Sequence, residues 1–265
     1  MSGRTLAPLG RRLCPVTAHA RHGAYTVLRC LDAEGPEPDP GQFYMLTAGE
    51  RWGGGADERP FLPRAFSFLR RHEDGTLDFL LEDVGPGTNR LCELRASDPL
   101  WILGPLGLGF RRPESNRRPL LAGGGVGIAP LAAWQDELIP THPQALVLLG
   151  FRDAAHAEGA ELLSGARLAT DDGSVGHHGI VTDLLRAELG CDPRATVYAC
   201  GPPPMLEAVR ALCAAEGVPA QLALEAGMAC GFGACFGCVV PTRGGYVRLC
   251  VDGPVLDAAD LELVA

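Results

Sequence analysis

The stretch RPLLAGGGVGIAP, residues 118–130, decides the fold of the second half of the chain. A short apolar run leads directly into a glycine-rich turn, and residues 129–139 then have the length and pattern of a helix. In such a strand–turn–helix unit, Gly125 and Gly127 allow a tight turn and let backbone N–H groups approach a diphosphate at the helix N-terminus. Many glycine-rich turns only reverse the chain, but the position between a strand and a helix favours nucleotide binding.

The same alternation of strand and helix patterns continues toward the C-terminus. Alternation of this kind predicts a parallel sheet with helices on its faces. The strand at 195–201 ends at Cys200, and the strand at 144–152 ends at Arg152. Ligands of open α/β sheets bind outside the carboxyl ends of the strands, so these ends should flank one crevice with the glycine turn. Arg152 is placed to meet a 2′-phosphate there, although an exposed arginine at a strand end needs no such role. The other predicted elements are strands at 166–172 and 219–225 and helices at 180–189 and 204–217.

The first half of the chain has a different pattern of apolar residues. Between residues 13 and 110, short alternating or β-branched runs are separated by turn residues, which predicts an antiparallel barrel or sandwich. One short helix is expected at 88–94. The predicted strands are 24–31, 42–48, 64–71, 76–84 and 99–107.

Composition excludes several classes of function. The 265 residues carry 32 acidic and 23 basic side chains, a formal charge of −9, which disfavours nucleic acid as the main partner. Glycine, proline or a charge interrupts every apolar run before the roughly 18 residues that span a bilayer. Residues 1–18 have no continuous apolar stretch of the kind found in a secretory signal, so we expect a cytoplasmic protein without a membrane span.

Three of the ten cysteines are crowded into EAGMACGFGACFGCVV, residues 225–240. Cys230, Cys235 and Cys238 have the spacing C-x4-C-x2-C, and Cys250 follows as a fourth thiol, in the second strand of a pair predicted at 238–242 and 246–251. This is the spacing of plant-type [2Fe–2S] ligands. Structural zinc, the main alternative, usually takes two separated C-x2–4-C pairs, and disulfides are rare in a reducing compartment. The remaining cysteines lack a mutual spacing and are expected to be buried, inert thiols: Cys14, Cys30, Cys92, Cys191, Cys200 and Cys213.

Two motifs of the first half are weak when taken alone. RAFS, residues 64–67, places a cation that can pair with phosphate and a hydroxyl that can donate to a ring nitrogen on one strand. GPGTN, residues 85–89, offers backbone and hydroxyl donors at a helix start. Each is also compatible with an ordinary strand or turn.

In chain order, RAFS, GPGT, GGGVGIAP, CGPPPM, the cysteine segment and CVDGPV resemble the motifs of the electron-transfer subunits of NAD-dependent, class 1B dihydroorotate dehydrogenases, within the ferredoxin–NADP reductase superfamily. The resemblance implies a fold of three parts: an FAD-binding antiparallel β-barrel at 1–112, an NAD-binding α/β domain with a parallel sheet at 113–222, and a small [2Fe–2S] segment at 223–265. It implies FAD contacts from Arg64, Ala65, Phe66, Ser67, Leu80, Leu81, Glu82, Gly87 and Thr88. The nucleotide motifs add Gly124, Gly125, Gly127, Cys200, Gly201 and Pro202 for NAD, and the cluster falls on Cys230, Cys235, Cys238 and Cys250.

The chain departs from this family at two places. Ala65 stands where the family often has proline, and Leu81–Glu82 stands where it usually has a tyrosine–arginine pair. The second departure removes a cation from the region expected for the flavin phosphates.

The resemblance also implies a function. A partner catalytic subunit oxidises dihydroorotate at its own FMN, and electrons cross the [2Fe–2S] cluster and FAD of this chain to NAD⁺, in an assembly of two copies of each subunit. Two alternatives stay open: an NAD(P)H-dependent reductase subunit of a hydrogenase or sulfite reductase, and a zinc-stapled binding protein without redox function. The motifs do not distinguish NAD from NADP.

Overall fold

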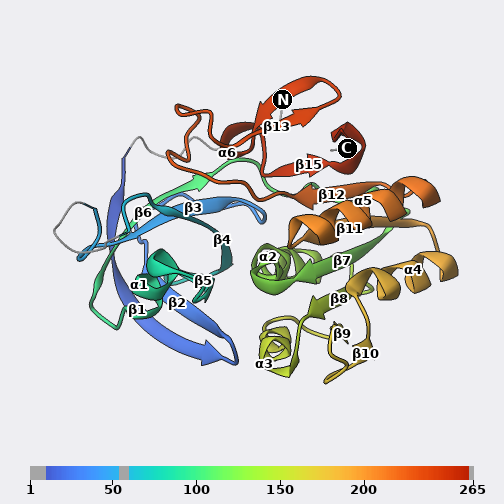
Figure 1. Cartoon of the computed structure of the whole chain (residues 1–265), viewed down its shortest axis with the longest axis horizontal. Helices are drawn as coiled ribbons and strands as arrows, with labels where there is room; N and C mark the ends of the chain where they lie inside the picture. The colour runs from blue at the N-terminus through green and yellow to red at the C-terminus, as the bar shows by residue number, and fades with distance from the viewer. Residues whose placement is uncertain (1–9, 54–59, 263–265) are drawn as a thin grey trace.

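The computed structural model describes residues 10–53 and 60–262, in three neighbouring parts (Figure 1). A β-barrel from the first part of the chain lies beside a sheet flanked by helices, and the C-terminal segment lies over the junction between them. Residues 1–9, on which half of the secretory-signal prediction rests, are outside the described residues. Among the described residues, no helix is long and apolar enough to cross a membrane.

The first part forms a closed antiparallel barrel in the strand order β1-β2-β5-β4-β3-β6. Strand β1 closes the barrel by pairing with β6, with Cys14 opposite Leu100. Side chains such as Leu28, Tyr44 and Phe79 fill the interior. The predicted helix is present as α1, Pro86–Cys92. The strands are β1 (Arg12–His22), β2 (Tyr25–Leu31), β3 (Phe43–Ala48), β4 (Arg64–Arg71), β5 (Thr76–Glu82) and β6 (Pro99–Leu106).

The second part is a sheet in the order β10-β9-β8-β7-β11-β12-β15. All neighbouring strands are parallel except the last pair, in which β15 runs antiparallel to β12. The prediction of a parallel sheet is therefore confirmed, but β15, which comes from the C-terminal segment, was not predicted. The strands are β7 (Arg118–Gly124), β8 (Leu146–Phe151), β9 (Arg167–Thr170), β10 (His177–His178), β11 (Ala195–Cys200), β12 (Ala220–Ala223) and β15 (Val255–Asp257).

Alternate side chains of the sheet strands build two cores. In β11, Val197 and Ala199 face the helices α4 and α5, whereas Tyr198 and Cys200 face α2. The last turn of α5 ends at Gly217 in the left-handed conformation, as predicted. The helices are α2 (Ile128–Leu138), α3 (Ala154–Ala157), α4 (Val181–Cys191) and α5 (Pro203–Glu216), with single 3₁₀ turns η1 (Gly125–Gly127), η2 (Glu158–Leu162) and η3 (Ala258–Asp260).

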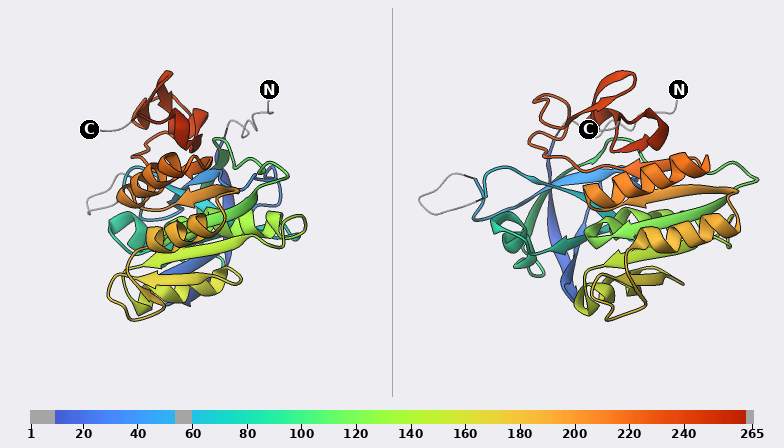
Figure 2. Two further views of the ribbon diagram at one scale, coloured as in Figure 1. Left: turned by 90° about the vertical axis from the view of Figure 1, so that its right-hand side faces the viewer. Right: turned by 45° about the vertical axis from the view of Figure 1, so that its right-hand side comes forward.

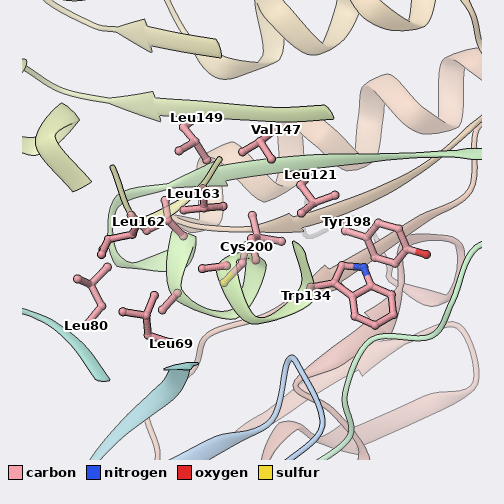
Figure 3. Close-up of a cluster of buried hydrophobic side chains, with 14 of the residues drawn as sticks. Leu69, Leu80, Leu121, Trp134, Val147, Leu149, Leu162, Leu163, Tyr198 and Cys200 are labelled. Atoms are coloured by element: carbon pink, nitrogen blue, oxygen red, sulfur yellow. The ribbon is translucent and has the colours of Figure 1, made fainter. Parts of the chain in front are cut away.

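The core on the α2 face is shared between the barrel and the sheet. Figure 3 shows Leu69 of β4 and Leu80 of β5 on one side of this helix, and Leu121, Val147 and Leu149 of the sheet on the other. All five side chains are almost fully buried. The barrel and the sheet are consequently joined by a continuous apolar layer.

The C-terminal segment packs on the barrel and then returns to the sheet (Figure 2). It contains the hairpin β13 (Val239–Thr242) and β14 (Gly245–Arg248), the short helix α6 (Leu249–Asp252) and then β15. Cys238 and Cys250 pack in one cluster with Phe43, Met45 and Leu106 of the barrel. The predicted hairpin is present, but the prediction that its second strand runs through Cys250 is wrong, because the chain turns into α6 at Leu249.

The expectation of buried, inert thiols outside the cysteine segment is wrong at two positions. Cys191 is exposed at the end of α4, and Cys92 is half-buried on α1. Both end a helix at the surface, where a periodic pattern does not fix burial. Cys14, Cys30, Cys200 and Cys213 are buried as expected.

Candidate functional site

A cavity of about 600 Å³ lies at the carboxyl ends of the parallel strands. Three of the predicted nucleotide residues, Gly124, Gly125 and Pro202, line it. The cavity is of the size that holds a small-molecule ligand or part of a dinucleotide. The remaining lining comes from Tyr25, Glu82, Val84, Gly150, Phe151, Arg152, His156, Asp171, Ile180, Val181, Thr182, Pro204, Met205 and Ala208.

The other predicted nucleotide residues support this turn from behind. A Cβ on Gly127 would lie 2.5 Å from the carbonyl carbon and oxygen of Cys200, so only glycine lets the β7 turn pass so close to the end of β11. Cys200 is buried beneath the turn, and this burial raises its pKa well above the ordinary thiol value. Gly201 is buried beside Met205. The structure thus brings the two predicted nucleotide motifs together. Gly127, Cys200 and Gly201 pack beneath the turn and do not line the cavity.

The predicted flavin residues of RAFS and GPGT meet on the barrel surface. The Arg64 guanidinium packs against the backbone of Gly87, where a Cβ would lie 2.4 Å from Arg64 Nε. Arg64 also lies over the Trp52 ring at 5.7 Å and donates to the carbonyl of Leu62. Thr88 Oγ1 accepts hydrogen bonds from the N–H groups of Val84 and Gly85 and so fixes the loop before α1. The two motifs, about 20 residues apart in the chain, therefore form one surface.

The remaining predicted flavin residues differ in what they can offer. Ala65 is exposed, and Phe66 and Ser67 are partly buried on β4, so all three have an accessible face. Leu80 and Leu81 are buried in opposite cores, which leaves their backbone as the part available to a ligand. The Tyr25 hydroxyl, which belongs to the cavity lining, is buried without a hydrogen-bond partner among the described residues. Such an orphaned hydroxyl fits a site that is completed by a polar cofactor.

Glu82 crosses from the barrel to the sheet domain. Its carboxylate accepts a hydrogen bond from Arg152 Nη2. Arg152 Nε also donates to His156 Nε2 at 2.9 Å, and His156 Nδ1 lies 2.6 Å from Asp153 Oδ1. His156 Nε2 also lies 3.3 Å from the same Glu82 carboxylate, so the ring stands between two carboxylates. Arg152 thus brings a cation from the sheet domain to Glu82 of the barrel.

The four predicted cluster ligands lie in one small region as two pairs. Cys230 is hydrogen-bonded to Cys235, and Cys250 to Cys238. The backbone of Gly233, which lies between the first two cysteines, also donates to the Cys250 thiol, so the pairs face each other. Among the described residues, no three histidine, cysteine or acidic side chains already converge on a single metal position.

Backbone N–H groups surround these thiols. The Sγ of Cys235 accepts from Gly237 N at 3.5 Å, and the Sγ of Cys238 accepts from Cys250 N at 3.5 Å. Gly233 has a φ of +88°, and a Cβ there would lie 2.7 Å from Val251, so the loop requires glycine. Sulfur atoms that accept several N–H bonds are typical of iron–sulfur sites, which fits the predicted cluster better than zinc.

The electrostatic surroundings differ between the thiols. Burial opposes ionisation of Cys230, but N–H donation from Cys235, Phe232 and Ala234 outweighs it and lowers the pKa to about 6. For Cys250, burial and the neighbouring Cys238 raise the pKa to about 12. As the pH rises, Cys230 therefore becomes a thiolate at a lower pH than Cys250 does.

Several site residues were not predicted from the sequence. Asp171 could have been found, because it directly follows β9 and strand ends of a parallel sheet meet at the ligand edge. His156 and Tyr25 carry no comparable signal. The place of Tyr25 in the site depends on how the barrel sits against the sheet, whereas His156 lies on α3, four residues after Arg152.

Solved structures share this arrangement. The chain aligns over 99% of its length with a protein from the structure of an NADH-dependent reduced ferredoxin-NADP oxidoreductase, covering 91% of that chain with a TM-score of 0.79 and 24% identity. A ferredoxin reductase of carbazole 1,9a-dioxygenase aligns with a TM-score of 0.67 and 24% identity, over 79% of this chain and 66% of that one. The barrel, the sheet and the cysteine segment together define a ferredoxin-reductase-like fold with an additional metal-binding segment.

Sequence relatives define the family. Residues 225–262 match the family model described as the iron–sulfur cluster binding domain of dihydroorotate dehydrogenase B. The dihydroorotate dehydrogenase B (NAD(+)) electron transfer subunit of Caldanaerobacter subterraneus subsp. tengcongensis is 36% identical, over 86% of this chain and 89% of that protein. The subunit of the same name from Geobacillus thermodenitrificans is 37% identical, over 85% and 87%. The chain belongs to the family of dihydroorotate dehydrogenase B electron transfer subunits, which confirms the resemblance drawn from the motifs.

Proposed function

We propose that this chain carries electrons from a partner subunit that oxidises dihydroorotate at FMN to NAD⁺, through a [2Fe–2S] cluster and FAD. The observation that carries the proposal is the cysteine segment 225–262, whose four thiols lie in a loop lined with N–H donors and match the family's cluster-binding domain. When bound, a nicotinamide exchanges hydride, a cluster passes single electrons, and a flavin does both.

The residues of the chain bind and position these groups. Arg64 and the Gly87–Thr88 turn offer a cation and fixed donors for the diphosphate of FAD, with Ser67 and the backbone of Leu80–Glu82 beside the ring. The Gly124–Gly125 turn and Pro202 offer the wall for NAD. Cys230, Cys235, Cys238 and Cys250 hold the cluster. No side chain of this chain is required to move a proton from dihydroorotate.

The cysteine loop is also the proposed contact with the partner. Cys235 is exposed, and its neighbours Phe232 and Phe236 are 57% and 62% exposed, unusual for large apolar side chains. Exposed aromatic side chains next to a redox centre suit a protein interface. The opposite side of the loop packs on Met45 and Leu106 of the barrel, so the cluster would lie between the partner and the flavin domain.

A single substitution separates the cluster from the flavin. Cys235→Ser should remove the iron–sulfur absorbance, and with it dihydroorotate-dependent NAD⁺ reduction. FAD and NADH-dependent reduction of ferricyanide should largely remain, because Cys235 neither lines the nucleotide cavity nor is among the partners of Arg64. Cys191→Ser, the removal of another exposed thiol, is the matched control and should change neither activity. Joint loss of FAD and both activities in Cys235→Ser would contradict this division of roles.

The complete function is tested by anaerobic co-expression with a candidate FMN-containing dihydroorotate dehydrogenase subunit. Dihydroorotate-dependent NAD⁺ reduction is expected only in the complex, and none in either subunit alone. The mass of the complex by light scattering should correspond to two copies of each subunit. If the complex forms with both flavins and the cluster but stays inactive, dihydroorotate is not the electron source. The chain would then serve another electron partner.

We also infer a cytoplasmic location, on chemical grounds. Four thiolates are kept available for a cluster only in a reducing compartment. The measurement is fractionation of the native cells followed by immunodetection of the chain.

A further inference from the structure

The charged lining of the nucleotide cavity is acidic on balance. Of the described residues that line it, Arg152 is the one cation, whereas Glu82 and Asp171 contribute carboxylates. His156 also lines it, and its two ring nitrogens lie next to the Glu82 and Asp153 carboxylates. A 2′-phosphate, which carries close to two negative charges at neutral pH, would therefore depend on Arg152 for its only charged contact in this lining.

Arg152 stands where the adenosine end of a dinucleotide is expected. Gly150 of β8 pairs with Gly124 of β7, so Arg152 lies two residues, or about 7 Å, beyond the level of the glycine turn on the neighbouring strand. In doubly wound sheets, an acidic residue near this strand end binds the ribose hydroxyls of NAD, and an arginine accommodates the 2′-phosphate of NADP. By its position alone, Arg152 would favour NADP.

Arg152 is not free to make that contact. Its Nη2 donates to Glu82 on the barrel, and its Nε donates to His156, which Asp153 holds in place. Glu82 is only 19% exposed, whereas Arg152 is 59% exposed, so the carboxylate depends more on this partner than the arginine does. To reach a 2′-phosphate, Arg152 would have to leave Glu82, whose carboxylate would then keep only His156 Nε2, at 3.3 Å, as a partner in the same cavity.

We propose that Glu82, a residue of the barrel, determines nucleotide specificity in the sheet domain by holding Arg152 and adding negative charge, so that NADP is rejected and NAD accepted. The inference rests on the proposed function, because it assumes that the cavity takes the nicotinamide dinucleotide. It also assigns a role to the departure at Leu81–Glu82: the family's usual cation at this place would repel Arg152, and the carboxylate engages it instead.

The test is Glu82→Gln in the full chain purified anaerobically with FAD. NADH and NADPH are compared as donors, with ferricyanide as acceptor. The ratio of kcat/KM for NADPH to that for NADH should rise about five- to twentyfold, the range expected when a charge-assisted hydrogen bond becomes available to a phosphate. The double variant Glu82→Gln with Arg152→Gln should lose this gain, because the gain requires the arginine.

Asp136→Asn is the matched control. Asp136 Oδ2 accepts from Arg70 Nε at 2.8 Å, which makes a second ion pair between the same two domains, outside the cavity lining. Asp136→Asn should leave the ratio of kcat/KM for NADPH to that for NADH unchanged. If Glu82→Gln lost FAD, binding of 2′,5′-ADP against 5′-AMP, measured by calorimetry, would report the same preference without the flavin.

The possible results distinguish a failure of the Glu82 proposal from a failure of the proposed function. Three results would overturn the role of Glu82. The ratio of kcat/KM values could stay unchanged, kcat/KM could rise equally for NADPH and NADH, or the rise could persist in the double variant. Absence of flavin absorbance or of NADH oxidation in the unmodified protein would instead overturn the proposed function.

Discussion

At the scale of single residues, Gly127 has no room for a side chain. Gly127→Ala would place a methyl group 2.5 Å from backbone atoms of Cys200, which cannot move without shifting β11. The expected cost is about 1–3 kcal/mol of unfolding free energy, or roughly 3–10 °C in Tm. The KM for NADH should also rise, because the turn that carries Gly124 and Gly125 is displaced.

A second glycine serves as the control for this prediction. Gly190 lies on the exposed side of α4, and a Cβ there would meet nothing within 4 Å. Gly190→Ala should therefore stabilise the helix by about 0.5–1 kcal/mol. Thermal unfolding followed by circular dichroism checks both variants. A Gly127→Ala protein as stable as Gly190→Ala would contradict the packing described between β7 and β11.

The sequence predicted residues best where the chemistry is local. The spacing of Cys230, Cys235 and Cys238 and the order of the glycine turn can be recognised within a few positions of the chain. Glu82 and Arg152 are 70 residues apart, and their contact depends on how two domains meet, so no local pattern contains it. The same holds for the Tyr25 hydroxyl in the cavity.

At the scale of elements, α4 is attached to the sheet through its C-terminal end. Arg118, at the start of β7, donates to the side chain of Glu188 at 3.0 Å and to the backbone carbonyls of Glu188 and of Asp192, the residue that follows α4. Glu188 also pairs with Arg167. A cation at a helix C-terminus is favourable because the last carbonyls are negative and unpaired. Glu188 thus connects α4 to two strands, β7 and β9.

The pH dependence of stability should reveal this attachment. Burial disfavours the Glu188 carboxylate, but hydrogen bonds from Arg118 and Arg167 outweigh it and hold the pKa below the ordinary value. A carboxyl group with a lowered folded-state pKa stabilises the fold above its unfolded pKa, and that contribution is lost as the pH falls. Glu188→Gln should cost about 1 kcal/mol at pH 7 and less near pH 4, where the loss of this contribution has begun.

Denaturant unfolding at the two pH values measures this difference. Glu216→Gln, on the exposed end of α5, is the matched control and should change stability little at either pH. A Glu188→Gln penalty that stayed constant between pH 7 and pH 4 would show that the carboxylate charge is not what attaches α4.

Elements were predicted well where burial imposes a periodic pattern and poorly where pairing alone makes the structure. Strand β1 was not predicted, because most of its side chains are exposed and leave no apolar alternation. The two-residue strand β10 was also not predicted. The strands and helices from β7 to β12 repeat a buried-strand and amphipathic-helix rhythm that burial on both faces imposes. Strand β15 has three residues and exists because its backbone pairs with Gln221, Leu222 and Ala223 at the sheet edge. A segment that short has no period to read.

At the scale of the whole molecule, the proposed divisions at residues 112 and 222 separate functions more clearly than they separate folding units. The apolar layer around α2 includes Leu69 and Leu80 of the barrel (Figure 3), and Arg70 crosses the same boundary to Asp136 and to the carbonyl of Leu162. Strand β15 carries the C-terminal segment back to the sheet. Because apolar burial is continuous across the parts, we expect one cooperative unfolding transition.

Leu69→Ala tests this expectation at the shared layer. Leu69 is 1% exposed, and truncating it should cost about 2–4 kcal/mol, because the cavity is enclosed by both domains. Leu28→Ala, inside the barrel core and 0% exposed, is the comparison. In both variants, flavin release followed by fluorescence and loss of secondary structure followed by circular dichroism should shift together. The contrary result would be that Leu28→Ala releases the flavin in a separate, earlier transition while the helical signal persists. The barrel would then be an independent folding unit. The ion pairs across the boundary would only orient two domains that are each stable alone.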